Sequence, residues 1–122
     1  MTQEQADALA LDWIEAWNAH NLEHILSHYA DNVTYVSPFA VQMLGDPRGE
    51  MRGKAAVRDY FTRALAAFPD LRFEFGHAFA GVDSLVIHYK SVRDLMAAEY
   101  FELGEDGKFT RVQCHYRPAT GK

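Results

Sequence analysis

The feature that most constrains the fold is a change in hydrophobic periodicity near residue 70. Before it, apolar residues recur at intervals of three and four, the spacing of one face of a helix. After it they alternate with polar residues, as Leu71, Phe73 and Phe75 do, which is typical of half-buried strands. Helices followed by strands predict an α+β fold with the helices on one face of an antiparallel sheet. A length of 122 residues fits a single domain, 1–122.

Three helices are expected in the first part of the chain. The first begins at a capping box formed by Thr2 and Gln5, and the second takes Asn21 as its N-cap and ends at Asp31. The third spans 54–68 and stops at a proline. Their apolar faces are Ala6, Leu9, Ala10, Trp13, Ile14 and Trp17, then Leu22, Ile25, Leu26 and Tyr29, then Val57, Tyr60, Phe61, Ala64, Leu65 and Phe68.

The expected strands carry most of the second half of the chain. Short links join the later ones, so we expect these to pair antiparallel. A segment from 39 to 53 reads as a loop that is long for a compact domain, and such loops often act as lids over a functional site. The strands are expected at 33–37, 71–75, 84–92, 97–103 and 109–116.

Composition and charge exclude several classes of protein. The formal net charge is −5 and no Lys/Arg cluster exceeds two residues, which disfavours a nucleic-acid partner. Cys114 is the single cysteine, so no intramolecular disulfide is expected. The chain shows no basic, apolar leader, and no apolar run approaches the roughly 18 residues that span a bilayer. We therefore expect no membrane association and a cytoplasmic protein.

The motifs, taken in order, resemble the nuclear transport factor 2-like superfamily, and most closely its SnoaL-like, polyketide cyclase-related branch. The resemblance implies a cone: a highly curved sheet wrapped on helices, with a pocket at the open end, in a homodimer that pairs through the outer sheet face. The superfamily includes isomerases, cyclases, dehydratases, epoxide hydrolases and non-enzymatic binding domains, so the fold does not fix the function. The motifs are Trp17-Asn18-Ala19-His20-Asn21-Leu22, Tyr29-Ala30-Asp31-Asn32-Val33, Ser37-Pro38, Gly53-Lys54-Ala55-Ala56-Val57 and Glu105-Asp106-Gly107-Lys108.

The resemblance also assigns three positions that are catalytic in ketosteroid isomerases. Ser37 takes the place of the carboxylate base that precedes a proline, and a serine hydroxyl needs an activating group to act as a base. Trp13 takes the place of an oxyanion-binding tyrosine, and its indole N–H donates a hydrogen bond without exchanging protons. Glu99 matches the second acid. Ketosteroid isomerase activity is therefore not expected, and Glu99 and Ser37 are the candidate catalytic residues.

Glu99 is also a candidate from the residue pattern alone. It shares one strand face with Ala97, Phe101 and Leu103, which are apolar, and a carboxylate there is costly unless it is paired or protonated. Burial would raise its pKa toward the range of a general acid or base. The alternative is a structural carboxylate held by a buried donor. The expected ligand-binding residues, each of which could instead be ordinary core, are Trp13, Tyr35, Tyr89, Cys114 and Tyr116.

The histidines and loop arginines are not expected to form a site. His20, His24 and His28 recur every four residues, but no glutamate of an HExxH motif lies between them. Because the apolar face of the second helix is already assigned, His24 and His28 should face solvent, and we expect no metal. Arg48 and Arg52 could reach over the pocket mouth, although solvated loop arginines are the more usual case. His88 and His115 are expected on the outer sheet face.

Two functions follow as expectations. The first is binding of a small, largely apolar organic ligand, with no cofactor. If the protein is an enzyme, we expect an isomerase, cyclase, dehydratase or hydrolase that moves a proton in a dry pocket. The second is a non-catalytic dimeric ligand-binding or scaffold domain, favoured if the pocket is filled by its own side chains and Glu99 is locked in a bidentate pair.

Overall fold

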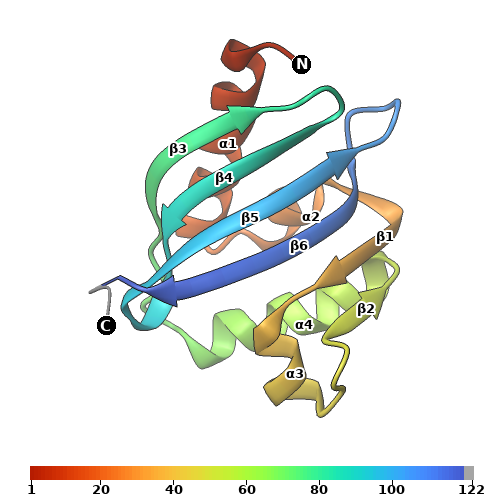
Figure 1. The fold of residues 1–122 in the computed structure, drawn as a ribbon. Coiled ribbons are helices and arrows are strands. Elements are labelled where there is room, and N and C mark those ends of the chain that lie inside the picture. The colour runs from red at the N-terminus through yellow and green to blue at the C-terminus, as the bar shows by residue number, and fades with distance from the viewer. Residues whose placement is uncertain (120–122) are drawn as a thin grey trace.

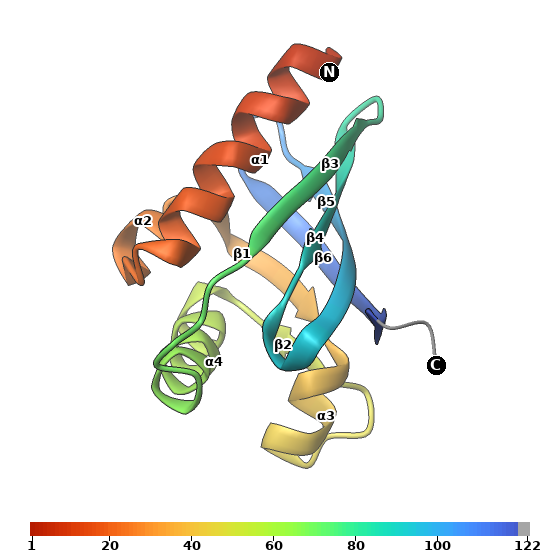
Figure 2. The same cartoon turned by 90° about the vertical axis from the view of Figure 1, so that its left-hand side faces the viewer.

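A computed structural model describes residues 1–119, which form one curved sheet with helices packed on one side (Figure 1). Turned by 90°, the view separates the two layers, with α1 and α4 on one side of the strands and α3 at one end (Figure 2). The elements are α1 (Gln3–Asn18), α2 (Leu22–Leu26), β1 (Tyr29–Val36), α3 (Pro38–Leu44), β2 (Glu50–Arg52), α4 (Lys54–Ala67), β3 (Glu74–Ala80), β4 (Ser84–Lys90), η1 (Val92–Asp94), β5 (Leu95–Leu103) and β6 (Phe109–Pro118).

The sheet confirms the α+β class and the antiparallel pairing of the late strands. Among the described residues it has six strands in the order β2-β1-β6-β5-β4-β3. The expectation of a purely antiparallel sheet is wrong in one place, because β1 runs parallel to β6, with Tyr35 beside Val112. These two strands are far apart in sequence, so no short link imposes an antiparallel pairing on them.

Helix α1 forms as its sequence predicts. Thr2 Oγ1 accepts from the Gln5 backbone N–H at 3.0 Å, and Gln5 Oε1 accepts from the Thr2 N–H at 2.8 Å, which completes the capping box. One face of the helix then packs on the interior. Its buried residues are Ala6, Ala10, Trp13, Ile14, Ala16 and Trp17.

The second helix is shorter than predicted. It ends at Leu26, and Tyr29 and Asp31 belong to β1 instead. Tyr29 has the helical spacing, but the backbone carbonyl of His28 accepts from the Phe109 N–H at 2.8 Å, and this pairing with β6 draws the chain into the sheet. Tyr29 is fully buried there. A long-range strand pairing therefore overrides a local helical pattern.

The segment from 39 to 53 is not the long loop that the sequence predicted. Ser37 caps α3, Pro38 occupies its first turn, and Gly45 ends it in the left-handed conformation at φ 69°. Strand β2 follows and pairs with β1. Gly49 makes the join possible, because a Cβ atom at this position would lie 2.5 Å from the Ser37 carbonyl oxygen.

Strand boundaries differ most at β3, which begins at Glu74 rather than residue 71. Leu71 and Phe73 precede it in a segment outside the sheet that the end of α1 holds in place. The Asn18 side chain donates to the Phe73 carbonyl at 3.0 Å and accepts from the Phe73 N–H at 2.7 Å, so Phe73 pairs with a side chain and not with a strand. Strand β1 begins four residues earlier than predicted, at Tyr29, and β4, β5 and β6 are within two residues of their predicted ends.

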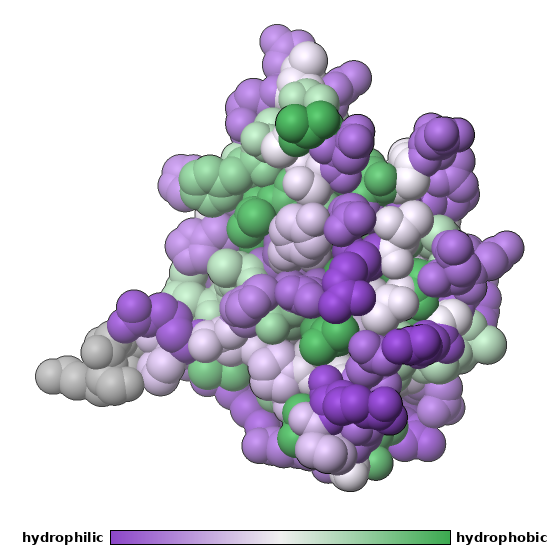
Figure 3. All heavy atoms as spheres, turned by 45° about the vertical axis from the view of Figure 1, so that its right-hand side comes forward, coloured by the Kyte–Doolittle hydropathy of each residue, from purple (hydrophilic) through white to green (hydrophobic). Residues whose placement is uncertain are grey.

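The surface is mainly hydrophilic on the face drawn in Figure 3, with hydrophobic side chains in separate smaller areas. His115 is exposed and His88 half-buried on the outer sheet face, where register places both beside Ala98. That placement was predicted; the homodimer expected through the same face stays a prediction. Within residues 1–119 no helix is long and apolar enough to cross a membrane.

Candidate functional site

A small cavity of about 50 Å³ lies between the sheet and the helices. This volume exceeds the minimum for one water but is far below the roughly 300–1,000 Å³ of typical ligand sites. Aromatic side chains make up much of its wall, and Glu99 is its one acidic residue. The lining residues are Trp13, Trp17, Tyr35, Phe39, Met43, Tyr60, Phe61, Ala64, Phe68, Leu71, Phe73, Tyr89, Ser91, Val92, Glu99 and Tyr116.

Glu99 is buried in this wall, with 1% of its surface exposed. Its Oε1 accepts a hydrogen bond from the Tyr89 hydroxyl at 2.5 Å, while Oε2 has no partner among the described residues. Burial raises the pKa of Glu99 from 4.5 to about 7, and the hydrogen bond from Tyr89 lowers it in part. The carboxyl group is therefore held near the midpoint of its titration at neutral pH.

Four of the five expected ligand-binding residues line the cavity with Glu99: Trp13, Tyr35, Tyr89 and Tyr116. The Trp13 ring stacks against Phe73 at 5.8 Å between centroids. Its indole N–H donates to the Tyr29 hydroxyl at 3.1 Å. The donor that was expected to face a ligand is thus already engaged inside the core.

Ser37 and Cys114 are not among the lining residues. The Ser37 hydroxyl accepts from the Phe39 N–H at 3.2 Å as the cap of α3. Cys114 lies beside Glu99 in the strand register, and its thiol donates to the Tyr35 hydroxyl at 3.2 Å. Burial raises the pKa of the Cys114 thiol well above its usual value, which disfavours a nucleophilic thiolate.

Trp17 is a cavity residue that sequence reasoning did not assign to the site. It is 5% exposed, and its indole N–H, like Glu99 Oε2, has no partner among residues 1–119. The sequence pattern placed Trp17, Tyr60 and Phe61 on buried helix faces, and this was the feature that could have identified them as cavity residues. Phe39 was missed for another reason: it lies on α3, where the sequence predicted a loop.

The end of α1 fixes one wall of the cavity. Asn18 holds Phe73 through the paired hydrogen bonds described above. His20, which has a φ of 54°, contacts the Leu71 carbonyl oxygen through Nε2 at 2.8 Å. Together, Asn18 and His20 hold in place the segment whose Leu71 and Phe73 side chains line the cavity.

An arginine does lie against two of the cavity-lining rings, but it is not one of the two considered from sequence. The Arg93 guanidinium lies 5.6 Å from the Phe39 ring centroid and 5.2 Å from that of Phe68, both of which line the cavity. Arg48 pairs with Asp46 and Arg52 with Glu50, and both arginine side chains are more than three-quarters exposed. They are the solvated surface arginines that the sequence favoured.

The expectation that His24 and His28 face solvent is wrong for His28, whose side chain is only 14% exposed. Both imidazoles meet Asp12 of α1 through their Nε2 atoms. No residue pattern indicated the contact with Asp12, because it depends on how α1 packs against α2. The three residues are the one group within 1–119 whose side-chain atoms are close enough to hold a metal ion together.

Comparison with known proteins agrees with the fold. Residues 10–112 match the family model described as a SnoaL-like domain. A SnoaL-like protein of unknown function from Burkholderia thailandensis is 45% identical, covering 95% of this chain and 97% of its own, with a TM-score of 0.92.

More distant structures share the architecture. A SnoaL-like protein from Agrobacterium tumefaciens with a provisional isomerase description is 17% identical over 93% of this chain and 98% of its own, at a TM-score of 0.75. A nuclear transport factor 2-like protein of unknown function from Cytophaga hutchinsonii is 16% identical over 94% and 92%, at 0.69. No curated protein matches the chain.

Proposed function

Because the chain belongs to the SnoaL-like family, we propose that its cavity binds a small, largely apolar organic molecule and that Glu99 engages it. The observation that carries the proposal is the Glu99 carboxyl group, buried among aromatic rings with Oε2 unpartnered in the described residues. A buried polar atom without a hydrogen bond costs free energy, and a ligand that supplies the bond offsets that cost.

The chemistry proposed is cofactor-independent acid–base catalysis. With its pKa raised by burial to about 7, Glu99 is present as both acid and base at neutral pH. Isomerisation, cyclisation, dehydration and hydrolysis each need such a proton transfer. In the simplest case the carboxylate takes a proton from carbon next to a ketone, leaving an enolate, and then returns a proton to that carbon.

The composition of the cavity wall supports one class of ligand. Aromatic side chains favour an apolar ring, and one carbonyl or hydroxyl group would meet Glu99. The unpartnered Trp17 N–H on the same wall can donate a hydrogen bond to that oxygen when the Glu99 carboxylate acts as the base. Because about 50 Å³ holds only a few atoms, a ring-sized ligand can bind only if side chains move. We propose that the side chains that move are Phe39 and Met43 of α3 and Val92 of η1, since both elements are short.

The second candidate, a non-catalytic binding or scaffold domain, is favoured by the cavity volume itself. The interior is largely filled by its own side chains, as expected for a structural core. Glu99 is not in a bidentate pair, since its hydrogen bond to Tyr89 involves one oxygen only. This second observation favours the first candidate.

Cyclohexanone is a suitable probe, because it is an apolar ring with one carbonyl and exchangeable α-hydrogens. The chain has two tryptophans, and both Trp13 and Trp17 line the cavity, so intrinsic fluorescence reports occupancy directly. In D₂O, NMR measures deuterium entering the α-positions. We expect a saturable fluorescence change, and deuterium exchange that is at least about 100-fold slower in Glu99→Gln than in wild type.

The matched control is Glu102→Gln, the same substitution on the outer face of the same strand, where Glu102 is exposed. It should leave exchange unchanged. Equal exchange rates in wild type and Glu99→Gln would remove Glu99 from the chemistry. Absence of any saturable fluorescence change, with no small molecule seen by native mass spectrometry of the purified protein, would favour the scaffold candidate.

A further inference from the structure

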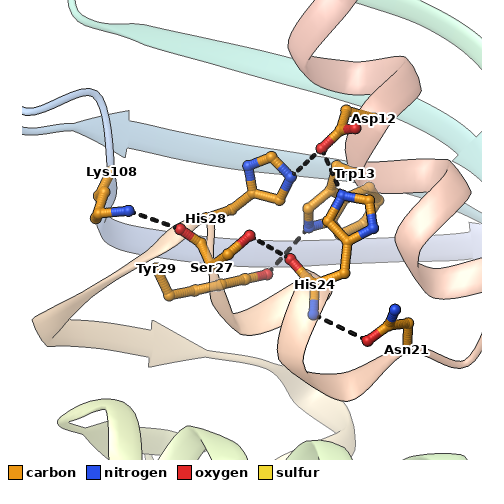
Figure 4. A network of polar contacts seen from close by, with 8 residues as sticks. All are labelled: Asp12, Trp13, Asn21, His24, Ser27, His28, Tyr29 and Lys108. Atoms are coloured by element: carbon orange, nitrogen blue, oxygen red, sulfur yellow. Dashed lines mark hydrogen bonds and ion pairs between the residues drawn. The ribbon is translucent and has the colours of Figure 1, made fainter.

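A second polar cluster lies outside the cavity, where α1 meets α2 (Figure 4). Asp12 Oδ2 of α1 lies 2.9 Å from His24 Nε2 and 2.7 Å from His28 Nε2. The three candidate ligand atoms all lie within 4.8 Å of one another. The side chains are part-exposed, at 47% for Asp12, 34% for His24 and 14% for His28, so the cluster is reachable from solvent.

We propose that Asp12, His24 and His28 bind a divalent transition-metal ion, with Zn²⁺ the best match. The bound ion would link α1 to the junction between α2 and β1. Two imidazoles and one carboxylate suit Zn²⁺, whereas Ca²⁺ and Mg²⁺ take mainly oxygen ligands. Zn–ligand bonds of about 2.0–2.2 Å in a tetrahedron separate the ligand atoms by about 3.3 Å. The two distances to Asp12, 2.9 and 2.7 Å, must widen slightly, and the two imidazole nitrogens, which lie within 4.8 Å of each other, must adjust to the same separation.

The two histidines are already oriented by their surroundings. The His24 backbone N–H donates to Asn21 Oδ1 at 3.1 Å, which caps α2. The His28 ring stacks on Phe109, with 5.8 Å between centroids, and on His24, with 5.9 Å. Lys108 Nζ donates to the Ser27 carbonyl at 2.8 Å and ties the same turn to the β5–β6 link (Figure 4). Ordered ligands lose less entropy when a metal binds.

The position of the cluster indicates a structural role. Asp12 and His28 each precede a core residue, Trp13 and Tyr29, and these two neighbours hydrogen-bond to each other inside the protein. The metal would therefore join from outside the same two segments that the Trp13–Tyr29 bond joins from inside. A metal bound only by the folded state stabilises it by mass action.

The alternative is an ion pair without a metal, in which both imidazoles share one carboxylate. Untagged full-length protein, treated with EDTA and dialysed, distinguishes the two when it is titrated with ZnCl₂ by calorimetry. The proposal expects saturable binding of one Zn²⁺ per chain. It also expects a melting temperature about 5 °C higher at a tenfold excess over the dissociation constant. Co²⁺ in place of Zn²⁺ should give the visible bands of a four-coordinate site, with three protein ligands and one water.

His24→Gln and His28→Gln should each weaken Zn²⁺ binding by at least about tenfold. His77→Gln, at an exposed histidine on β3, is the matched control and should bind as wild type does. Circular dichroism in EDTA checks that each variant is folded. Failure of wild type to bind, or full binding in a folded His24→Gln,His28→Gln double variant, would overturn the proposal and leave the ion pair. Neither result bears on the cavity, because the cyclohexanone assay runs in EDTA.

Discussion

Asp12 and Trp13 are neighbours on α1, yet they face two different environments. Trp13 is 1% exposed and belongs to the interior that contains Glu99, whereas the Asp12 side chain is 47% exposed and meets two histidines. The pKa values of the two carboxyl groups, Glu99 in the interior and Asp12 near the surface, shift in opposite directions. Burial raises the pKa of Glu99 to about 7. Burial also acts to raise that of Asp12, but hydrogen bonds and charge from His24 and His28 outweigh it and lower the pKa.

The groups next to a carboxyl group, together with its burial, decide whether it is protonated. At Glu99 burial raises the pKa and outweighs the hydrogen bond from the neutral Tyr89 hydroxyl, so the group tends to hold a proton. Asp12 meets groups that can carry positive charge, and so it stays ionised. The interior site is thereby suited to proton transfer and the outer one to holding a cation.

The largest expected effect comes from the interior side of the contrast. Trp13→Ala removes a ring that packs against Trp17, Phe73 and Tyr89 and breaks the bond to Tyr29, so it should cost about 3–5 kcal/mol in urea unfolding.

The control for Trp13→Ala is Leu11→Ala, two positions earlier on α1 with Leu11 52% exposed. It should change stability by no more than about 1 kcal/mol. Similar losses in both variants would mean that the two faces of α1 do not differ as described.

The second effect is a pH dependence that belongs to Glu99. Because its folded pKa of about 7 exceeds 4.5, the folded state binds the proton more tightly than the unfolded state. This favours folding at low pH, and the advantage is lost as pH rises through about 7. The loss between pH 4.5 and 7.5 should be about 3 kcal/mol. Glu99→Gln should remove it, which urea unfolding at several pH values measures.

Glu102→Gln serves again as the control, and its pH profile should follow that of wild type. A Glu99→Gln profile that still falls by the same amount would assign the pH dependence to another group.

The smallest expected effect is on the outer side. In EDTA, Asp12→Asn should destabilise the protein by less than about 1 kcal/mol, because part-exposed ion pairs are screened by water and salt. Chemical unfolding at low and high salt measures this, and the difference from wild type should shrink as salt rises. A loss of several kcal/mol would place Asp12 with the core groups instead.

Much of the interior was predictable from sequence, and the reasons are local. The Thr2–Gln5 capping box and the apolar faces fixed α1 and α4, and strand alternation placed Glu99 on an apolar face. Helix α3 was missed although Ser37-Pro38 and Gly45 are start and stop signals for a helix, because only seven residues lie between its ends.

Other features had no local signal. The parallel pairing of β1 with β6 joins residues far apart in the chain. Because of this pairing, Tyr29 lies in a strand and not in the helix predicted from its spacing. Asp12 meets His24 and His28 only through the packing of α1 on α2. The Arg93 position depends on a φ of 56° in η1, which a non-glycine residue rarely adopts. Contacts of this kind come from tertiary structure, which periodicity does not encode.

The most direct test of the account is an NMR titration of the Glu99 side-chain carboxyl carbon in the folded protein, assigned by comparison with Glu99→Gln. A buried carboxyl group whose pKa is raised by desolvation should titrate near pH 7, well above the exposed glutamates. A midpoint near 7 supports a group able to exchange protons in the cavity at neutral pH. A midpoint at or below 4.5 would show a stably ionised, structural carboxylate and would contradict a role for Glu99 in proton transfer.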